Sequence, residues 1–462
     1  MMPLKQFTTD FKNIGQQEFL RPNVGYRYFF DIQNSEVYPS KRSMKLKYIL
    51  KEIPVKKVSK GELENAETLI DIGNIERRFN NLIDLEQVEK IGSDKNILQS
   101  GDIIIPKMQP QMGNIFLNIK HERYIGSTEL LEYSVLKNNN AIFIYYLITS
   151  RKFLEDLGRL ESGKTHRRVN SVDLLKIKIP LLSREKQDRV VAQIKPIEKK
   201  IKELKSQIAP AQEVINKVFA REFGFDLKKF EDLKKIKNYF IDLAEYADNK
   251  DFRNSVNFHN KAGKFIIEEL RKVTNKRIKN FIAEPIVLGT SISPADFDEN
   301  GEYYYVSMAT VKNYILELDD SQLVSNSYST ENLNKAIKKD DIIMTRSGVA
   351  IGKFALVEED IEGIFADFTM RIRLKNYNPL FAYYYFRSEY FQYLIHTNKK
   401  GLQNKNIFPS QIQELPMIDI SLRDQQKIVN EIKAELDRQE EMREKIEAER
   451  SKIDEIIEQA VR

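Results

Sequence analysis

The sequence predicts an α+β protein in which a mixed α/β unit, followed by a long helix, occurs twice. Three observations predict this fold class: a long internal repeat, a helical spacing of apolar residues after each copy, and short apolar runs of strand length between turn residues. The chain has 462 residues, of which 41% are hydrophobic and 31% are charged. That length and composition suit two to four globular domains with sizeable cores.

The repeat is clearest in an aromatic segment. Residues 136–153 align without gaps on residues 374–391, and nine of these 18 positions are identical. The offset between the copies is 238 residues there and 239 residues further upstream. Two more pairs of segments match: residues 187–195 with 425–433, and residues 100–115 with 339–354, the latter aligning Asp102 with Asp341, Lys107 with Arg346 and Gly113 with Gly352. One ancestral unit has therefore been used twice.

Each copy ends in a segment whose apolar residues are spaced by threes and fours. This spacing predicts long amphipathic helices over residues 184–222 and 422–462. The first segment has a net charge of +4 and the second of −3, so we expect the helices to pack against each other rather than to self-associate. Pro196 and Pro210 predict a kink or an interruption in the first helix. The second has alanine at both matching positions and is expected to run straighter.

The parts between these helices are predicted to mix strands and helices. The expected strands cover residues 70–75, 102–105, 303–308 and 341–344, the expected glycine turns cover residues 112–113 and 347–348, and buried helices are expected around Tyr145 and Tyr383. No low-complexity linker separates the parts, so we expect them to interleave along the chain.

Composition excludes several classes of protein. The chain has no cysteine, which rules out disulfides, cysteine-based zinc sites, iron–sulfur clusters and thiol catalysis. The four histidines are scattered, so no histidine-rich metal site is expected. No apolar run is long enough for a transmembrane span, and the first residues lack the apolar core of a secretory signal. The net charge of +6 is too small by itself to indicate a nucleic-acid partner.

Two motifs imitate enzyme signatures. Residues 158–165 match the phosphate-binding pattern GxxxxGK[ST], but the segment before them has a helical pattern, whereas that motif requires a preceding strand. The second copy has Gly401 opposite Gly163 and no GK[ST]. Residues 378–381, NPLF, resemble the NPPF motif of amino-methyltransferases without its second proline, and we interpret them as a turn into a helix. The sequence thus offers no catalytic constellation.

The two copies share a glycine inside a basic, polar loop. The first basic loop is residues 163–168 and the second is residues 399–405, and each is accompanied by a polar turn near residue 109 or 347. One such loop is ordinary solvated surface, but two equivalent ones suit two equivalent contacts on a polyanion. The candidate DNA-binding residues are Lys107, Gln109, Gln111, Lys164, Arg167 and Arg168 in the first copy, and Arg346, Ser347, Lys399, Lys400, Gln403, Asn404 and Lys405 in the second.

A duplicated order of three motifs covers essentially the whole chain: an Asp-Ile-Ile strand, the basic glycine loop, and the helix opening QxxxVxxIK. This order resembles the DNA-specificity subunits of type I restriction–modification systems. The resemblance implies target-recognition domains over residues 1–183 and 223–421, and conserved helices over residues 184–222 and 422–462. It also implies that the helices form an antiparallel coiled coil with pseudo-two-fold symmetry. Each domain is expected to read half of a split DNA target, and the helices to fix the unread spacer.

The same resemblance implies a subunit that is not itself an enzyme and holds no cofactor. Its expected partners are double-stranded DNA, two methyltransferase subunits that use S-adenosylmethionine, and two restriction subunits that use ATP and Mg, in the cytoplasm of a prokaryote and without a membrane. Two alternatives stay open. One is the specificity partner of a fused methyltransferase–nuclease (type IIB-like) system, which neighbouring genes would reveal. The other is a coiled-coil scaffold, which would bind protein tightly and show no salt-dependent affinity for DNA.

Overall fold

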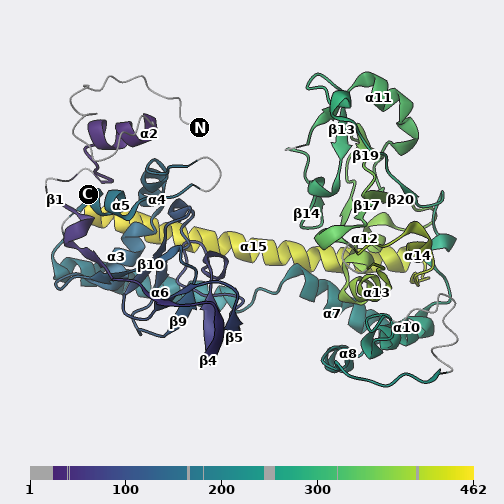
Figure 1. Ribbon diagram of the computed structural model, residues 1–462, viewed down its shortest axis with the longest axis horizontal. Coiled ribbons are helices and arrows are strands. Elements are labelled where there is room, and N and C mark those ends of the chain that lie inside the picture. The colour runs from purple at the N-terminus through teal and green to yellow at the C-terminus, as the bar shows by residue number, and fades with distance from the viewer. Residues whose placement is uncertain are drawn as a thin grey trace. The chain divides into compact units, whose positions relative to one another are not determined.

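The computed structural model describes residues 24–38, 40, 42–163, 167–180, 182–243, 255–319, 321–401 and 405–462. The chain folds into two compact units, whose elements are labelled in Figure 1. Unit 1 comprises Met1–Gln207 and Met442–Arg462, and unit 2 comprises Ile208–Glu441. The C-terminal segment therefore belongs to the unit that the N-terminal half of the chain forms.

Unit 1 is built on sheets with the strand orders β3-β6-β9-β4-β5, β2-β10-β7-β8 and β1-β11. The strands are β1 (Ser43–Lys45), β2 (Leu50–Glu52), β3 (Lys56–Val58), β4 (Gly61–Ile70), β5 (Glu86–Ile91), β6 (Lys95–Leu98), β7 (Ile103–Pro106), β8 (Phe116–Leu117), β9 (Tyr124–Gly126), β10 (Leu130–Val135) and β11 (Lys178–Pro180). The helices are α2 (Val24–Arg27), α3 (Ala141–Ile148), α4 (Arg151–Gly158), α5 (Ser171–Lys176), α6 (Arg184–Lys205) and the C-terminal part of α15 (Leu422–Val461). Ile104 and Leu130 of one sheet pack on Leu98 and Tyr124 of another, which gives these sheets a common core.

Unit 2 has the strand orders β12-β20-β17-β18, β16-β13-β19 and β14-β15. The strands are β12 (Val287–Leu288), β13 (Tyr303–Val306), β14 (Val311–Lys312), β15 (Ile315–Leu316), β16 (Leu323–Val324), β17 (Ile342–Thr345), β18 (Phe354–Leu356), β19 (Gly363–Phe365) and β20 (Thr369–Ile372). The helices are α7 (Ala211–Phe223), α8 (Leu227–Lys234), α10 (Lys261–Val273), α11 (Asn326–Glu331), α12 (Pro379–Arg387), α13 (Glu389–Asn398), α14 (Pro409–Gln413) and the N-terminal part of α15. A core rich in aromatic side chains joins Phe219 of α7, Phe381 of α12, Phe391 of α13 and Ile432 of α15.

The repeated sequence forms repeated local structure. The order β2-β10-β7-β8 in unit 1 corresponds to β12-β20-β17-β18 in unit 2, and the paired strands are antiparallel in both. The strand register is also the same, because Ile105 pairs with Leu131 and Met344 pairs with Met370, each at the upstream offset of 239 residues. The strand order and the register of this sheet are therefore the same in both copies.

The N-terminal ends of both aromatic helices are held by the same pair of polar side chains, an asparagine cap and a buried glutamine. Asn140 caps α3 and Asn378 caps α12, each accepting two backbone N–H groups through its side chain. The backbone N–H of Asn140 donates to Oε1 of Gln187 at 2.6 Å, and that of Asn378 donates to Oε1 of Gln425 at 2.8 Å. Gln187 and Gln425 are 1% and 2% exposed. The NPLF motif is thus an N-cap with proline in the first turn, as interpreted from the sequence.

The predicted strand over residues 70–75 is wrong, and the predicted strand over residues 303–308 is too long at its C-terminal end. Residues 70–75 do not form one strand, because β4 ends at Ile70 and the backbone N–H of Asp71 donates to Oδ1 of Asn74 at 2.7 Å, which closes a turn. Similarly, β13 ends at Val306, since the Ser307 side chain caps a following 3₁₀ turn. The other two predicted strands, the glycine turns and both aromatic helices are confirmed.

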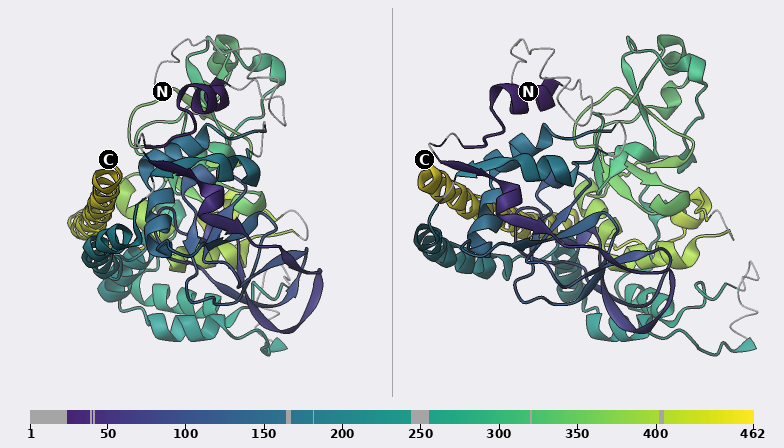
Figure 2. Two further views of the ribbon diagram at one scale, coloured as in Figure 1. Left: turned by 90° about the vertical axis from the view of Figure 1, so that its left-hand side faces the viewer. Right: turned by 60° about the vertical axis from the view of Figure 1, so that its left-hand side comes forward.

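The first predicted long helix is interrupted and the second is continuous. α6 ends at Lys205, and α7 begins after Pro210, whose ring starts the new helix, while Pro196 lies within α6 without ending it. α15 runs for 40 residues without a break. In unit 1, α6 lies beside the C-terminal part of α15 (Figure 2), where Nζ of Lys200 is 2.6 Å from Oε1 of Glu449.

Candidate nucleic-acid interface

The first basic loop meets the turn after β7, as the sequence suggested. The backbone N–H of Gln109 donates to the carbonyl of Arg167 at 3.1 Å, and that of Val169 donates to the carbonyl of Lys107 at 2.9 Å. Arg168 and Ser162 then exchange two backbone hydrogen bonds of 2.9 Å, which close the loop at its base. Lys107, Gln109, Arg167 and Arg168 therefore share one edge of unit 1.

The second basic loop is built in the same way. The backbone N–H of Ile407 donates to the carbonyl of Arg346 at 3.0 Å, and Ser347 bridges to Asn406. Lys400 and Asn406 exchange two backbone hydrogen bonds of 2.7 Å. Every one of these contacts lies 238 or 239 residues after its counterpart in unit 1, so the described bases of the two loops are equivalent in structure.

Backbone geometry explains the shared glycine. Gly163 has a φ of 107° and Gly401 a φ of 112°, in the region that side chains with a Cβ atom rarely adopt. Gly163 directly follows Ser162 and Gly401 directly follows Lys400, and both of these residues belong to the bridge that closes their loop. The glycine of the phosphate-binding match is therefore a turn residue. The segment before it is helix α4, not the strand that a phosphate-binding loop needs.

Two arginines of the first basic loop are paired with acids. Nε and Nη2 of Arg168 donate to the two carboxylate oxygens of Glu129 at 2.9 and 3.1 Å, and Nη1 of Arg167 lies 4.0 Å from Oε2 of Glu161. Burial raises the pKa of Glu161. Both arginine side chains remain about half exposed or more, at 48% and 63%. Their charge is thus partly neutralised before any polyanion arrives.

Gln111 does not share the exposed edge that Gln109 occupies. Its Oε1 atom is buried and has no hydrogen-bond partner among the described residues, and its Cγ lies close to the backbone of Gly158. The side chain therefore packs toward α4. Gln109 has a φ of 46° and lies at the surface. The 3₁₀ turn that follows it, Pro110–Met112, directs Gln111 inward.

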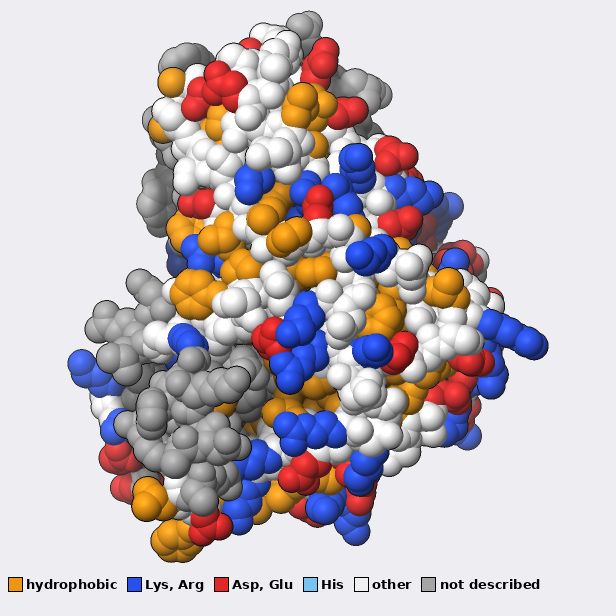
Figure 3. All heavy atoms as spheres, turned by 90° about the vertical axis from the view of Figure 1, so that its right-hand side faces the viewer, with side chains coloured by type: hydrophobic (Ala, Val, Ile, Leu, Met, Phe, Trp, Pro, Cys, Tyr) orange, Lys and Arg blue, Asp and Glu red, His pale blue; other side chains and the backbone are white. Residues whose placement is uncertain are grey.

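The second basic loop concentrates positive charge. Burial and the nearby Lys405 lower the pKa of Lys399, and burial together with Lys399 and Lys405 lowers the pKa of His396. Lys405 is exposed. On the face drawn in Figure 3, Lys and Arg side chains lie among hydrophobic and acidic ones. Like charges held this close favour an anionic partner.

A basic groove adjoins the second basic loop. It has a volume of about 710 Å³, and its lining includes Lys400 of the loop, Arg271 at the end of α10 and Lys276 just after it. Its acid, Glu414, is held by Arg277 and Lys279, whose hydrogen bonds lower the pKa of this carboxyl. These cations were not among the residues predicted from the sequence, although residues 271–279 include five basic side chains.

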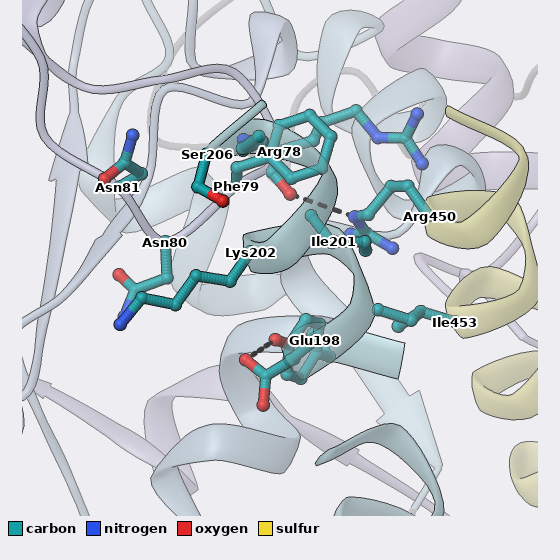
Figure 4. A pocket seen from close by; sticks show the side chains of 12 residues that line it. Arg78, Phe79, Asn80, Asn81, Glu198, Ile201, Lys202, Ser206, Arg450 and Ile453 are labelled. Carbon is teal, nitrogen blue, oxygen red and sulfur yellow. Dashed lines mark hydrogen bonds between the residues drawn. The ribbon is translucent and has the colours of Figure 1, made fainter. Parts of the chain in front are cut away.

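Unit 1 contains a separate cavity of about 480 Å³, between α6, α15 and the turn that begins at Arg78 (Figure 4). Most of its ionic side chains are committed to structural contacts. Arg78 pairs with Asp454, Tyr146 donates to Glu198, and Lys205 lies 3.4 Å from the centre of the Phe79 ring. This cavity therefore shows no arrangement of groups set for chemistry.

Some predicted features lie beyond what the structure describes. Lys164, Gln403 and Asn404 are outside the described residues.

Within the described ranges, His, Asp and Glu side chains form no group of three or more that could hold a metal ion. Among the helices of the described residues, none is both long and apolar enough to cross a membrane.

Residues 45–210 and 273–450 match the family model described as the type I restriction modification DNA specificity domain. The chain belongs to the type I restriction–modification DNA specificity family. The two matches cover well over half of the chain, and each contains one of the basic loops. A comparison with curated proteins gives no match.

Three solved structures are similar to this specificity protein over most of its length. One, described as "Structural basis underlying complex assembly and conformational transition of the type I R-M system", is 14% identical, covers 92% of this chain and 98% of its own, and has a TM-score of 0.46. The HsdS subunit from Thermoanaerobacter tengcongensis is 13% identical, with coverages of 91% and 96% and a TM-score of 0.34. The type I S subunit from M. genitalium is 11% identical, with coverages of 91% and 96% and a TM-score of 0.35. At these values, the family assignment rests on the family-model match alone.

Proposed function

We propose that this specificity protein reads a split DNA target, with unit 1 and unit 2 each recognising one half. The observation that carries this proposal is the pair of equivalent basic loops, which share backbone hydrogen bonds while differing in side chains. A common frame places each loop in the same way on a duplex, and different side chains on it select different bases. The half-sites should therefore differ in sequence.

The long helices are proposed to pack as an antiparallel pair and to fix the unread spacer. Two ion pairs support this: Lys200 with Glu449 within unit 1, and Arg221 with Glu431 within unit 2. From the first pair to the second, the residue number rises from 200 to 221 in one segment and falls from 449 to 431 in the other, as it does in antiparallel helices. At 1.5 Å per residue, the 40 residues of α15 span about 60 Å, or about 18 base pairs of duplex.

The protein is proposed to act as a subunit without catalytic activity of its own. It would dock two methyltransferase subunits that use S-adenosylmethionine and, in the larger complex, two restriction subunits that use ATP and Mg. A type IIB-like partner, in which methyltransferase and nuclease are fused, would use the same recognition surface. The genes adjacent to this one distinguish the two architectures.

A salt titration tests the DNA-binding claim. The affinity of the full chain, alone or with its methyltransferase partner, for a labelled duplex should fall about 10³-fold or more between about 50 and 200 mM salt if roughly six phosphates are contacted. Replacing Arg271 and Lys276 of the basic groove by alanine should weaken binding evenly across sequences and reduce the salt slope by about 1 per residue. Fluorescence anisotropy measures both effects.

Lys217 provides the matched control for this experiment. It is an exposed cation of unit 2 that pairs with Glu213 one turn earlier on α7, away from the groove. Lys217→Ala should leave the slope unchanged. An affinity that does not depend on salt would favour the scaffold alternative instead.

A further inference from the structure

The guanidinium of Arg346 is held in one orientation at the surface of unit 2. Its Nε donates to the backbone carbonyl of Asp367 at 3.1 Å. Its Cζ lies 5.9 Å from the ring centres of both Phe368 and Phe408. A backbone hydrogen bond and two aromatic rings thus restrain this side chain before a ligand arrives. The conformational entropy that the side chain loses on binding is therefore smaller than for an unrestrained arginine.

Both rings are unusually open for phenylalanine. Phe368 is 47% exposed and Phe408 is 41% exposed. They are 40 residues apart in the sequence and are brought together by the backbone: Arg346 donates its N–H to the carbonyl of Phe368, and its own carbonyl accepts from Ile407. Exposed apolar groups gathered around one cation on a loop indicate a binding surface.

The free end of the guanidinium faces no acceptor in the described chain. Among the described residues, Nη1 and Nη2 of Arg346 have no hydrogen-bond partner, and neither is a buried unsatisfied atom. Two parallel N–H donors therefore remain for a ligand with two adjacent acceptors. In DNA, the O6 and N7 atoms of guanine in the major groove have that spacing.

We propose that Arg346 reads a guanine in the half-site of unit 2, and that Phe368 and Phe408 are its positioning residues. This inference rests on the proposed function of the protein. The rings hold the fork in the plane of a base pair and cover apolar base edges beside it, such as a thymine methyl group.

A phosphate fits this surface less well than a base edge. An arginine fork also matches two phosphate oxygens, so the fork alone does not separate a phosphate from a guanine edge. The exposed Lys405 in the same loop is a compact cation with access to water, which suits a phosphate contact. Two phenyl rings beside the cation would instead remove water from a phosphate without returning hydrogen bonds. The rings pack favourably only against another flat or apolar group.

Unit 1 lacks this arrangement at the equivalent place. The offsets of the repeat put Lys107, Glu129 and Asn170 opposite Arg346, Phe368 and Phe408. The backbone contact is kept, because Lys107 donates its N–H to the carbonyl of Glu129 at 2.7 Å. Glu129 instead binds Arg168. The guanine preference should therefore belong to one half-site only.

Methylation maps of cells carrying the wild-type gene, no gene, or a variant test the inference. Arg346→Ala and Arg346→Lys should each relax one G·C position in one half-site, with a preference about 10- to 100-fold weaker there, and leave the other half-site unchanged. Lysine keeps the charge but lacks the two-donor fork, so it should not restore the preference. Phe368→Ala with Phe408→Ala should relax the same position.

Lys405→Ala is the matched control, expected to lower methylation evenly at all sites without altering the motif. The inference is overturned if the Arg346 variants behave like this control, or if Arg346→Lys keeps full specificity. An Arg346 variant that fails to fold would abolish methylation at all sites. In that case the double phenylalanine variant, which removes only exposed rings, tests the inference: relaxation of one G·C position supports it, and an unchanged motif overturns it. If the wild-type and deleted strains have the same map, the proposed function itself fails, and this inference with it.

Discussion

Replacing Arg450 by alanine should destabilise unit 1 by about 3–5 kcal/mol. Arg450 is 1% exposed and lies on the C-terminal part of α15. Its guanidinium donates to the carbonyl of Arg78 at 2.9 Å, to the carbonyl of Thr149 at 3.0 Å and to Asp454 at 2.9 Å (Figure 4 shows the bond to Arg78). Its loss leaves the carbonyl of Arg78 without a donor among the described residues, and the carbonyl of Thr149 with only the longer bond of 3.5 Å from Nε of Arg78. These losses cost far more than the loss of a surface ion pair.

Circular dichroism during urea or thermal unfolding measures this change. Arg438→Ala is the matched control on the same helix, because its side chain is 63% exposed and its ion pair among the described residues is with Glu435 one turn earlier. The expected cost is at most about 0.5 kcal/mol. A loss below about 1 kcal/mol for Arg450→Ala would show that the C-terminal segment is not anchored to unit 1 through this residue.

Lengthening the helices by two turns should lengthen the DNA spacer by about three base pairs. Seven helical residues add about 10.5 Å, and duplex DNA rises about 3.4 Å per base pair. Lys433 ends the helix opening QxxxVxxIK of the second copy, but the structure argues against an insertion directly after it. Ile432 is fully buried, and Gln439 accepts the backbone N–H of Ala209 at 2.9 Å, so an insertion there would shift packed residues within unit 2.

The better position is after Glu441, where the chain passes from unit 2 to unit 1, with seven residues also added after Gln207. Methylation mapping should then find both half-site sequences unchanged and the gap between them longer. An insertion of the same length in the exposed turn after Asn300 is the control and should leave the gap unchanged. A change in either half-site would contradict the ruler model.

The sequence predicted the parts of the fold that depend on local pattern. The repeat located the paired strands β7 and β17, the aromatic helices and the long helices, because these follow from periodicity and from aligned residues. It also brought together the basic loops and their turns. Arg450 was not predicted to be buried, since on a charged helix it looks like any surface arginine, and its partners Arg78 and Thr149 are about 300 residues away or more.

The candidate site was predicted less completely. The pairing of Arg168 with Glu129 depends on a contact across 39 residues, and the two rings around Arg346 come from separate turns. No periodic signal marks such contacts, because they arise when strand register fixes which loop ends meet. Gln111 looked equivalent to Gln109 in sequence, and only the left-handed conformation of Gln109 separates the two side chains.

A methylome of the source cells with and without this gene would show whether the protein specifies a split DNA target. If the protein specifies a split target, deletion should abolish methylation at one motif that consists of two different short half-sites separated by a fixed gap. Retention of every methylated motif in the deleted strain, under conditions in which the gene and its methyltransferase partner are expressed in the parent, would contradict the account.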